Sequence, residues 1–338
     1  MRAMVMTGFG GPEVLKLREI PAPTISGPDD VLIRVHAAGV NPADWKTRSY
    51  PVEGYNFGEV GSEMILGLEA AGVVEAVGSA VTRLKPWDRV YFVDGGFGSH
   101  SGNYKEYKVL HQDCVARMPA HLDFPMAAAI PTVFLTAWEP LVERQGVKAG
   151  DFVLVHGGAG GVGHMAVQIA RLQGARVAVT VSSEKKAQLA ASMGAERIIR
   201  YRDEDVGAAV RSWSGKDGAD VVFDAVGGDT FAKSIDLTAP YGTLINCAGF
   251  EWPRTNPANA VMRGIKIVFE NMGLPQILAN IGLRKRQREV LEIASNLFDE
   301  GKLRLIYDRS YALELAGAAQ EALEHNQIVG RLSLDFSL

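Results

Sequence analysis

The chain has 338 residues, of which 47% are hydrophobic and 22% charged, and its formal net charge is −4. This length accommodates two domains, and this balance is typical of a globular protein rather than a disordered one. Because acidic and basic residues are scattered along the chain, we expect neither nucleic acid nor a membrane surface as a partner.

The cysteine content also restricts the class of protein. Only Cys114 and Cys247 occur, far apart in the sequence, which argues against a disulfide scaffold and excludes a cysteine-rich metal site. The N-terminal residues do not have the pattern of a signal peptide. The most apolar stretch, 124–138, contains two prolines and is shorter than the roughly 18 residues that a membrane span needs. We therefore expect a cytoplasmic protein.

Short β-like segments fill the chain up to about residue 120. They are rich in branched and aromatic residues, lie between Gly, Pro and Asp turns, and cover 31–35, 71–77, 89–93 and 104–109. This pattern predicts a mostly antiparallel β domain.

After Asp123 the pattern changes to strands that alternate with helices. The predicted strands are 152–155, 176–181, 196–199, 220–223 and 243–246, and the predicted helices are 162–173, 184–193 and 229–237. Such alternation predicts parallel strands joined by right-handed crossovers. Residues 265–269 are a candidate sixth strand.

The C-terminal part has four further predicted elements. They are a basic amphipathic helix at 285–298, a strand near 303–307, a helix at 313–323 and a β-like stretch at 330–336. We expect this part of the chain to return to the first domain.

A glycine-rich loop, Gly157 to Gly163, lies between the first predicted strand and the first predicted helix of this alternating region. It fits the dinucleotide fingerprint: Gly158 would allow the tight turn, Gly160 the close approach of a pyrophosphate, and Gly163 the packing of helix near strand. Gly161 and Val162 complete the predicted phosphate site at the helix N-terminus. A purely structural glycine turn is the alternative.

The end of the second strand bears on the choice of cofactor. NAD enzymes usually carry Asp or Glu there, whereas this strand ends in Ser182-Ser183, followed by Lys185 and Lys186. Small hydroxyls and lysines suit a 2′-phosphate, so the sequence favours NADPH. Alternatively, both lysines belong to a solvated helix face.

At this point the sequence resembles the medium-chain dehydrogenase/reductase superfamily, in its zinc-free quinone oxidoreductase (zeta-crystallin-like) branch. The resemblance covers nearly the whole chain and is carried by five motifs, at 38–44, 67–74, 135–137, 157–163 and 224–227. It implies an α/β fold in which a Rossmann doubly wound parallel sheet is joined to a mostly β, GroES-like catalytic domain. The implied domains are 1–125, completed by 275–338, and 126–274.

The resemblance also implies cofactor contacts and an assembly. Lys186 and Tyr201 match positions that hold the NADPH 2′-phosphate, and Ser182 is more polar than the residue usual in the branch. The other implied cofactor contacts are Thr136, Val226, Ala248, Phe250 and Asn326. Relatives of this kind pair their Rossmann sheets edge to edge, so we expect a homodimer through 265–269.

The positions that bind catalytic zinc in related alcohol dehydrogenases carry other residues here. Asn41 stands at the first ligand position, Leu68 at the histidine position, and Ile130-Pro131-Thr132 near the third. A catalytic zinc needs three protein ligands, so we expect no metal. Without a Lewis acid, electron-poor substrates suit the site better than unactivated alcohols.

Four residues are candidates for the chemistry. Asn41 could pair with the nicotinamide carboxamide or ribose, or could simply form a turn before Pro42. Lys46 matches a lysine that lies beside the nicotinamide ribose in some enone reductases that resemble this branch, although a surface lysine is the alternative. Tyr50 could donate a proton or line the pocket. Thr132 could approach the nicotinamide or only face along a helix.

The sequence therefore predicts an oxidoreductase that transfers hydride from NADPH to a quinone or an α,β-unsaturated carbonyl. The alternative from another class is a non-catalytic NADPH-binding protein of the crystallin type.

Overall fold

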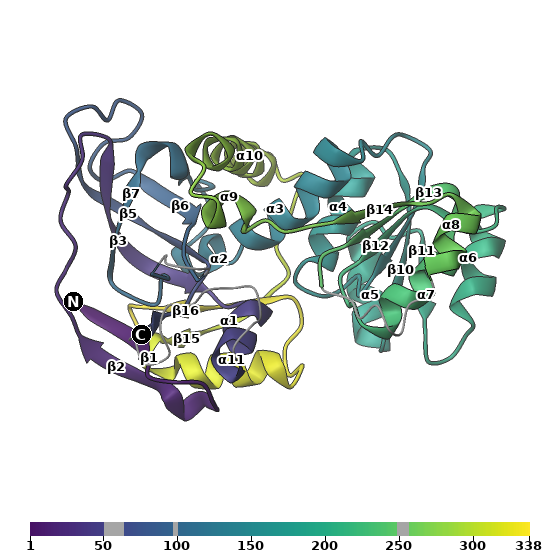
Figure 1. Ribbon diagram of the computed structural model, residues 1–338, viewed down its shortest axis with the longest axis horizontal. Coiled ribbons are helices and arrows are strands. Elements are labelled where there is room, and N and C mark those ends of the chain that lie inside the picture. The colour runs from purple at the N-terminus through teal and green to yellow at the C-terminus, as the bar shows by residue number, and fades with distance from the viewer. Residues whose placement is uncertain (51–63, 97–100, 249–256) are drawn as a thin grey trace. The chain divides into compact units, whose positions relative to one another are not determined.

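The computed structural model describes residues 1–50, 64–96, 101–248 and 257–338. The chain divides into two compact units. The terminal unit contains both chain ends, Met1–Thr132 and Gly273–Leu338, and the central unit is Val133–Met272. Each unit has its own sheet system (Figure 1).

The central unit is built on a six-stranded sheet in which every neighbouring pair is parallel. Its strands are β9 (Phe152–His156), β10 (Arg176–Val181), β11 (Arg197–Arg200), β12 (Ala219–Asp224), β13 (Thr238–Asn246) and β14 (Lys266–Phe269). The order β11-β10-β9-β12-β13-β14 reverses direction between β9 and β12. This is the doubly wound Rossmann arrangement, so the predicted fold class is confirmed.

Helices pack against this sheet (Figure 1). They are α4 (Gly163–Leu172), α5 (Glu184–Ser192), α6 (Val206–Ser214), α7 (Asp229–Leu237) and α8 (Pro257–Arg263). The sequence pattern predicted α4, α5 and α7 but did not single out α6 or α8. Asp205 caps α6 by accepting from the Ala208 N–H, and Gly215 ends the helix at φ 66°.

The terminal unit has two sheets. A three-stranded sheet joins β2 (Leu15–Glu19), β1 (Arg2–Met6) and β4 (Met64–Ile65). The larger sheet contains β15 (Tyr307–Ala312), β16 (Arg331–Asp335), β3 (Asp30–Gly39), β5 (Glu69–Val77), β6 (Arg89–Val93) and β8 (Ala116–Arg117), and β7 (Tyr107–His111) pairs with β3. All of its pairs are antiparallel except β15 with β16. The C-terminal strand β16 lies next to β3, so the chain end does return to the first domain.

Helices and short helical turns complete the terminal unit. They are η1 (Pro12–Val14), α1 (Pro42–Ser49), η2 (Gln112–Cys114), α2 (Phe124–Ala128), α9 (Leu274–Ile277), α10 (Ile281–Asp299), η5 (Leu313–Leu315) and α11 (Ala316–Glu324). The strand predicted near 303–307 was wrong, because the strand begins only at Tyr307. Leu303 and Ile306 are buried outside a strand, and the strand that follows them is mostly polar.

One helical stretch, Phe124–Arg144, is longer than the apolar segment considered from the sequence. It comprises α2, α3 (Pro131–Trp138) and the π-helical η3 (Glu139–Arg144). Its 21 residues and its mean hydropathy of 1.2 would suffice for a membrane span, yet 72% of its most apolar part is buried inside the fold. Burial of this kind is common for core helices of globular proteins.

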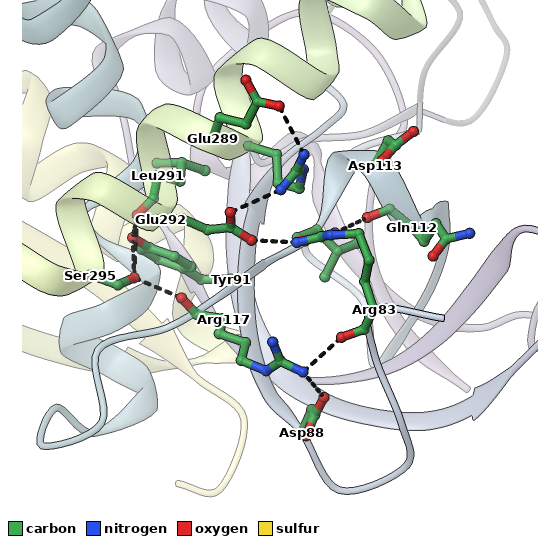
Figure 2. A network of polar contacts seen from close by, with 12 residues as sticks. Arg83, Asp88, Tyr91, Gln112, Asp113, Arg117, Glu289, Leu291, Glu292 and Ser295 are labelled. Carbon is green, nitrogen blue, oxygen red and sulfur yellow. Dashed lines mark hydrogen bonds and ion pairs between the residues drawn. The ribbon is translucent and has the colours of Figure 1, made fainter. Parts of the chain in front are cut away.

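Helix α10 is held to the terminal unit by a network of polar contacts (Figure 2). Arg83 pairs with Glu292, which also accepts from Arg288 at 2.9 Å. Beside this pair, the Ser295 hydroxyl lies 2.8 Å from the Tyr91 hydroxyl and donates to the Arg117 carbonyl at 2.6 Å. Because these partners lie in β6, β8 and the loop before β6, the network fixes the middle of the helix.

Candidate functional site

The glycine loop has the geometry of a phosphate cradle. Gly157 makes the tight turn, with φ 71°, so the assignment of that turn to Gly158 was wrong. Gly158 instead packs against β10, where a Cβ would lie 2.6 Å from Val179 Cβ, and a Cβ on Gly163 would lie 2.1 Å from the Gly157 carbonyl. On Gly160 the nearest atom to a Cβ would be 3.1 Å away. The loop therefore has no room for larger side chains at its two ends.

Three consecutive backbone N–H groups at the start of α4 are available to a ligand. In the described part of the chain, the N–H groups of Gly161, Val162 and Gly163 donate to no acceptor. Free N–H groups at a helix N-terminus, with the positive end of its dipole, are a ready site for a phosphate. The residues present thus fit the pyrophosphate of a dinucleotide.

The loop lies at the point where the strand order reverses, between β9 and β12. The turn after β12 contains Val226, which is 55% exposed and comes within 3.3 Å of where a Gly157 Cβ would be. Asp224, fully buried at the end of β12, accepts from the N–H groups of Val226 and Gly227 at 2.8 and 2.9 Å. The structure therefore brings together two predicted cofactor loops at the place where Rossmann sheets bind dinucleotides.

A buried polar row runs along the strand ends beneath these loops. Thr180, His156, Asp224 and Asn246 are direct neighbours in register on β10, β9, β12 and β13. His156 Nδ1 lies 3.0 Å from the Thr180 hydroxyl, which also accepts from the Gly157 N–H at 3.3 Å. Burial lowers the pKa of His156 to about 4. A neutral histidine therefore anchors the first residue of the glycine loop.

The residues predicted to bind the 2′-phosphate follow β10 and β11 and are partly exposed to solvent. Ser182 and Lys186 are half-buried, and Tyr201 is 48% exposed. Ser183 caps α5 by accepting from the Lys186 N–H. Arg200 is engaged by Glu184 and Asp203, whereas Lys186 forms no ion pair among the described residues. The Lys186 ammonium therefore has no competing partner there.

Glu69 organises the candidate residues of the terminal unit. This fully buried carboxylate accepts from Asn41 Nδ2 at 2.8 Å and from the Thr132 N–H at 2.7 Å. It also forms a buried ion pair with Arg331, whose Nε donates to the Ala129 carbonyl at 2.9 Å. Because a carboxylate only accepts, Asn41 must turn its amide nitrogen toward Glu69.

Asn41 also begins α1, and Asp44 completes the capping arrangement. Asp44 accepts from the Asn41 N–H at 2.8 Å and from the Gly67 N–H at 3.0 Å. Burial raises the pKa of Asp44 to about 7, and the nearby Glu69 adds to this shift. A cap with two bonds to the backbone is thus retained although its carboxyl group is desolvated.

The structure places Lys46 and Tyr50 on the more accessible side of the same helix. Lys46 is half-buried, with its ammonium 5.8 Å from the centre of the Trp45 ring, and it forms no ion pair in the described part of the unit. Tyr50, 49% exposed, ends the helix. The Lys46 ammonium is therefore available to contact a ligand.

The remaining predicted residues are less informative. Thr136 is buried on α3 and Ala248 is half-buried after β13. Asn326 is exposed at the end of α11 with φ 55°, a left-handed position that asparagine tolerates for local reasons. Phe250 lies outside the described residues.

Among the described residues, no group of three or more His, Cys, Asp or Glu side chains is placed so that it could hold a metal ion. Leu68 is buried at the position of the histidine ligand, and Asn41 uses its amide nitrogen on Glu69.

Sequence reasoning missed Glu69, Arg331, His156 and Asp224 as site residues. Glu69 and Asp224 stood inside recognised motifs, and His156 and Asp224 each directly follow a predicted strand and end the observed one. A polar residue at the carboxyl end of a buried parallel strand is a signal that could have identified the latter two. Arg331 gave no local signal, because its partner is 262 residues away.

Family comparisons agree with this architecture. Residues 27–120 match the alcohol dehydrogenase GroES-like domain, and residues 161–283 match the zinc-binding dehydrogenase domain. A parallel Rossmann sheet together with a GroES-like domain defines a two-domain dehydrogenase.

Relatives and solved structures narrow the assignment. Quinone oxidoreductases of Sus scrofa and Pseudomonas aeruginosa are each 33% identical, covering 97% and 95% of this chain and 95% of each relative. The structure of Escherichia coli quinone oxidoreductase complexed with NADPH aligns with a TM-score of 0.85, 28% identity and coverage of 99% of this chain and 100% of that one. The chain therefore belongs to the medium-chain dehydrogenase/reductase superfamily, in its quinone oxidoreductase branch, and is an oxidoreductase.

The structural neighbours differ in their cofactor. An NAD-dependent alcohol dehydrogenase aligns with a TM-score of 0.87 and 32% identity, covering 99% of both chains. The comparisons therefore support a nicotinamide cofactor as a class.

We predict that Glu69→Gln will destabilise the protein strongly, because it leaves Arg331 buried without its counter-charge. Breaking one side of a buried pair costs about 3–5 kcal/mol. Urea unfolding should show this loss, and the double variant Glu69→Gln/Arg331→Met should lose less than the sum of the single variants. Glu75→Gln, on the exposed face of the same strand, should stay within about 0.5 kcal/mol of the parent. Additive losses would show that the pair is not coupled.

Proposed function

We propose that this protein is a zinc-independent reductase that uses NADPH to reduce quinones or α,β-unsaturated carbonyls. The observation that carries the proposal is the set of unpaired N–H groups on Gly161, Val162 and Gly163 at the reversal point of a parallel sheet. Such a site binds a dinucleotide pyrophosphate. When bound, the nicotinamide supplies a hydride, which goes to an electron-poor carbon of the substrate.

The residues of the terminal unit define the other half of the chemistry. Asn41 is held by Glu69 and can orient the nicotinamide amide or its ribose. Lys46, without an ion-pair partner in the described part of the unit, can stabilise the negative charge that develops on the carbonyl or quinone oxygen. These roles would be unnecessary in a protein that only binds NADPH.

A consumption screen tests the reaction class directly. NADPH oxidation is followed at saturating cofactor with small quinones, enones and aldehydes side by side. Turnover of quinones or enones, with little on aldehydes, is the expected outcome. Absence of turnover on all three classes, with tight NADPH binding retained, would favour the non-catalytic alternative.

The choice of NADPH over NADH rests on Ser182, Lys186 and the absence of an acid at the end of β10. We predict that NADPH binds more tightly than NADH and that Lys186→Ala removes most of this difference. Loss of a charge-assisted phosphate contact costs about 1.5–3 kcal/mol, or roughly tenfold to a hundredfold in affinity. Fluorescence titration measures both constants. Lys233→Ala, an exposed lysine on α7, should change neither, and an unchanged preference in Lys186→Ala would contradict the assignment.

Zinc independence follows from the residues at the ligand positions, although one matching domain carries a zinc-binding name. Asn41 and Leu68 cannot replace a thiolate and an imidazole as zinc ligands. We predict that activity survives chelators and that elemental analysis finds no stoichiometric zinc in the purified protein. One zinc per chain would overturn this part of the proposal.

Lys46 is the proposed oxyanion partner during enone reduction. Loss of such a donor typically lowers kcat by about 10²–10³ while changing cofactor binding little. We predict this result for Lys46→Met with enones, and a smaller loss with quinones because their reduced oxygens are more stable anions. Lys16→Met, on the exposed strand β2, serves as the control. Wild-type turnover of the best enone by Lys46→Met would assign Lys46 to the surface.

We also propose a cytoplasmic homodimer. Both cysteines are free, as a reducing compartment requires. Strand β14 is paired only with β13 in the described part of the sheet, and such an edge can pair with a second copy.

Light scattering at micromolar concentration should therefore give twice the chain mass of 36.4 kDa. Ile267→Pro on β14 cannot extend a sheet across the edge and should shift the protein toward the monomer. A monomer mass for the unmodified protein would exclude this assembly.

A further inference from the structure

The terminal unit contains a buried group of charged side chains that the proposed chemistry does not use. We name Asp94, Lys105, Lys108 and Arg284 the basic cluster. Asp94 follows β6, Lys108 lies on β7, and Arg284 lies in the first turn of α10. Lys105 and Lys108 are 8% and 6% exposed, and Asp94 is 2% exposed.

The charges in this cluster do not balance. Asp94 is the acidic partner of both Lys108 and Arg284. Lys105 has no carboxylate partner: its ammonium donates to the Ser101 hydroxyl at 2.9 Å, and its side chain forms no other hydrogen bond or ion pair among the described residues. Three basic groups therefore share one acid. A desolvated ammonium without a counter-charge tends to lose its proton, and a bound anion would stabilise its charged form.

The electrostatics of Lys105 agree with a missing anion. Burial is the main reason that the pKa of Lys105 is lowered to about 7; the charge of Lys108 also lowers this pKa, and Asp94 opposes the shift. The fourth member of the cluster, Arg284, contacts Asp94. A carboxylate beside Lys105 would favour its charged form and raise this pKa.

The cluster adjoins the segment that holds the candidate catalytic residues. The Asp94 N–H donates to the Leu68 carbonyl at 2.9 Å, and Asn103 Nδ2 donates to the Gly67 carbonyl at 2.9 Å. Gly96 approaches Leu68 so closely that a Cβ would lie 2.7 Å from its Cδ2. Leu68 directly precedes Glu69, which holds Asn41 and Thr132. The basic cluster and the candidate nicotinamide residues thus share one stretch of chain.

The position of Arg284 is fixed independently. The contacts of Arg83 and Ser295 with α10 and its neighbours hold the helix from which Arg284 extends (Figure 2). The cluster is therefore preorganised, which reduces the entropy lost when an anion binds.

We propose that Lys105 and Lys108 bind a carboxylate on the substrate, so that the substrate is an electron-poor alkene that carries a carboxylate group. This inference rests on the proposed function and names its substrate class. When this alkene is conjugated to a ketone, NADPH is oxidised to NADP⁺ as its hydride adds to the carbon β to the ketone. A proton from solvent adds to the α carbon, and the carboxylate is unchanged.

The first test compares one substrate with and without its charge. The probes are 4-oxopent-2-enoate and its methyl ester, and kcat/KM is measured from NADPH oxidation. The ratio of acid to ester should fall about tenfold to a hundredfold in Lys105→Met, as expected for the loss of a charge-assisted contact. Lys105→Arg should restore part of it. Lys85→Met removes an exposed lysine of the same unit and should leave the ratio unchanged.

Turnover of the methyl ester by Lys105→Met shows that the variant is folded. If its acid-to-ester ratio equals that of the parent, the carboxylate site is excluded. Another outcome is that the parent protein reduces benzoquinone while Lys105→Met leaves the acid-to-ester ratio of kcat/KM unchanged. In that case the proposed function stands and only the carboxylate site is excluded.

The second test needs no turnover. Calorimetry measures the binding of 4-oxopentanoate to the NADP⁺ complex at about pH 8, in two buffers with different heats of ionisation. Because Lys105 is largely neutral there before binding, the parent protein should take up a proton, and Lys105→Met should not. Binding without proton uptake, or no binding at millimolar ligand, would overturn the proposal even if the protein reduced none of the substrates above.

Discussion

The buried ion pair between Glu69 and Arg331 is the constraint on which the terminal unit depends. It links β5 to the last strand, β16, and the same carboxylate holds the Asn41 amide and the Thr132 N–H. Two desolvated charges are tolerated because each has additional hydrogen bonds. The pair therefore does more than join distant parts of the chain: it sets which way the Asn41 amide faces.

In the central unit, hydrogen bonds rather than an ion pair position the residues described above at the strand ends. His156 is neutral between Thr180 and Asp224, and Asp224 receives two backbone N–H groups from the next loop. Hydrogen bonds to Thr180 and Asp224 thus hold the glycine loop and the loop after β12.

The distance along the chain between interacting residues explains which features the sequence predicted and which it missed. The glycine loop, β10 and α7 depend on neighbours within a few residues, so periodicity and fingerprint sufficed for them. The strand β15 was misplaced because its residues are mostly polar and its partner β16 decides its position. Glu69 and Arg331 escaped notice as a pair because only the folded chain brings them together. The same holds for the basic cluster, because Arg284 on α10 is far from Asp94, Lys105 and Lys108 in the sequence.

Glu69 and Asp94, two buried carboxylates of the terminal unit, differ in the number of basic groups around them. Glu69 has one cationic partner, and its remaining contacts are an amide and a backbone N–H. Asp94 has two cationic partners, and a third basic group, Lys105, has no carboxylate partner of its own among the described residues. A balanced site is complete by itself, and its arrangement does not change when a ligand arrives. Beside Leu68 the basic groups outnumber the acids, and a carboxylate of the proposed substrate would balance them.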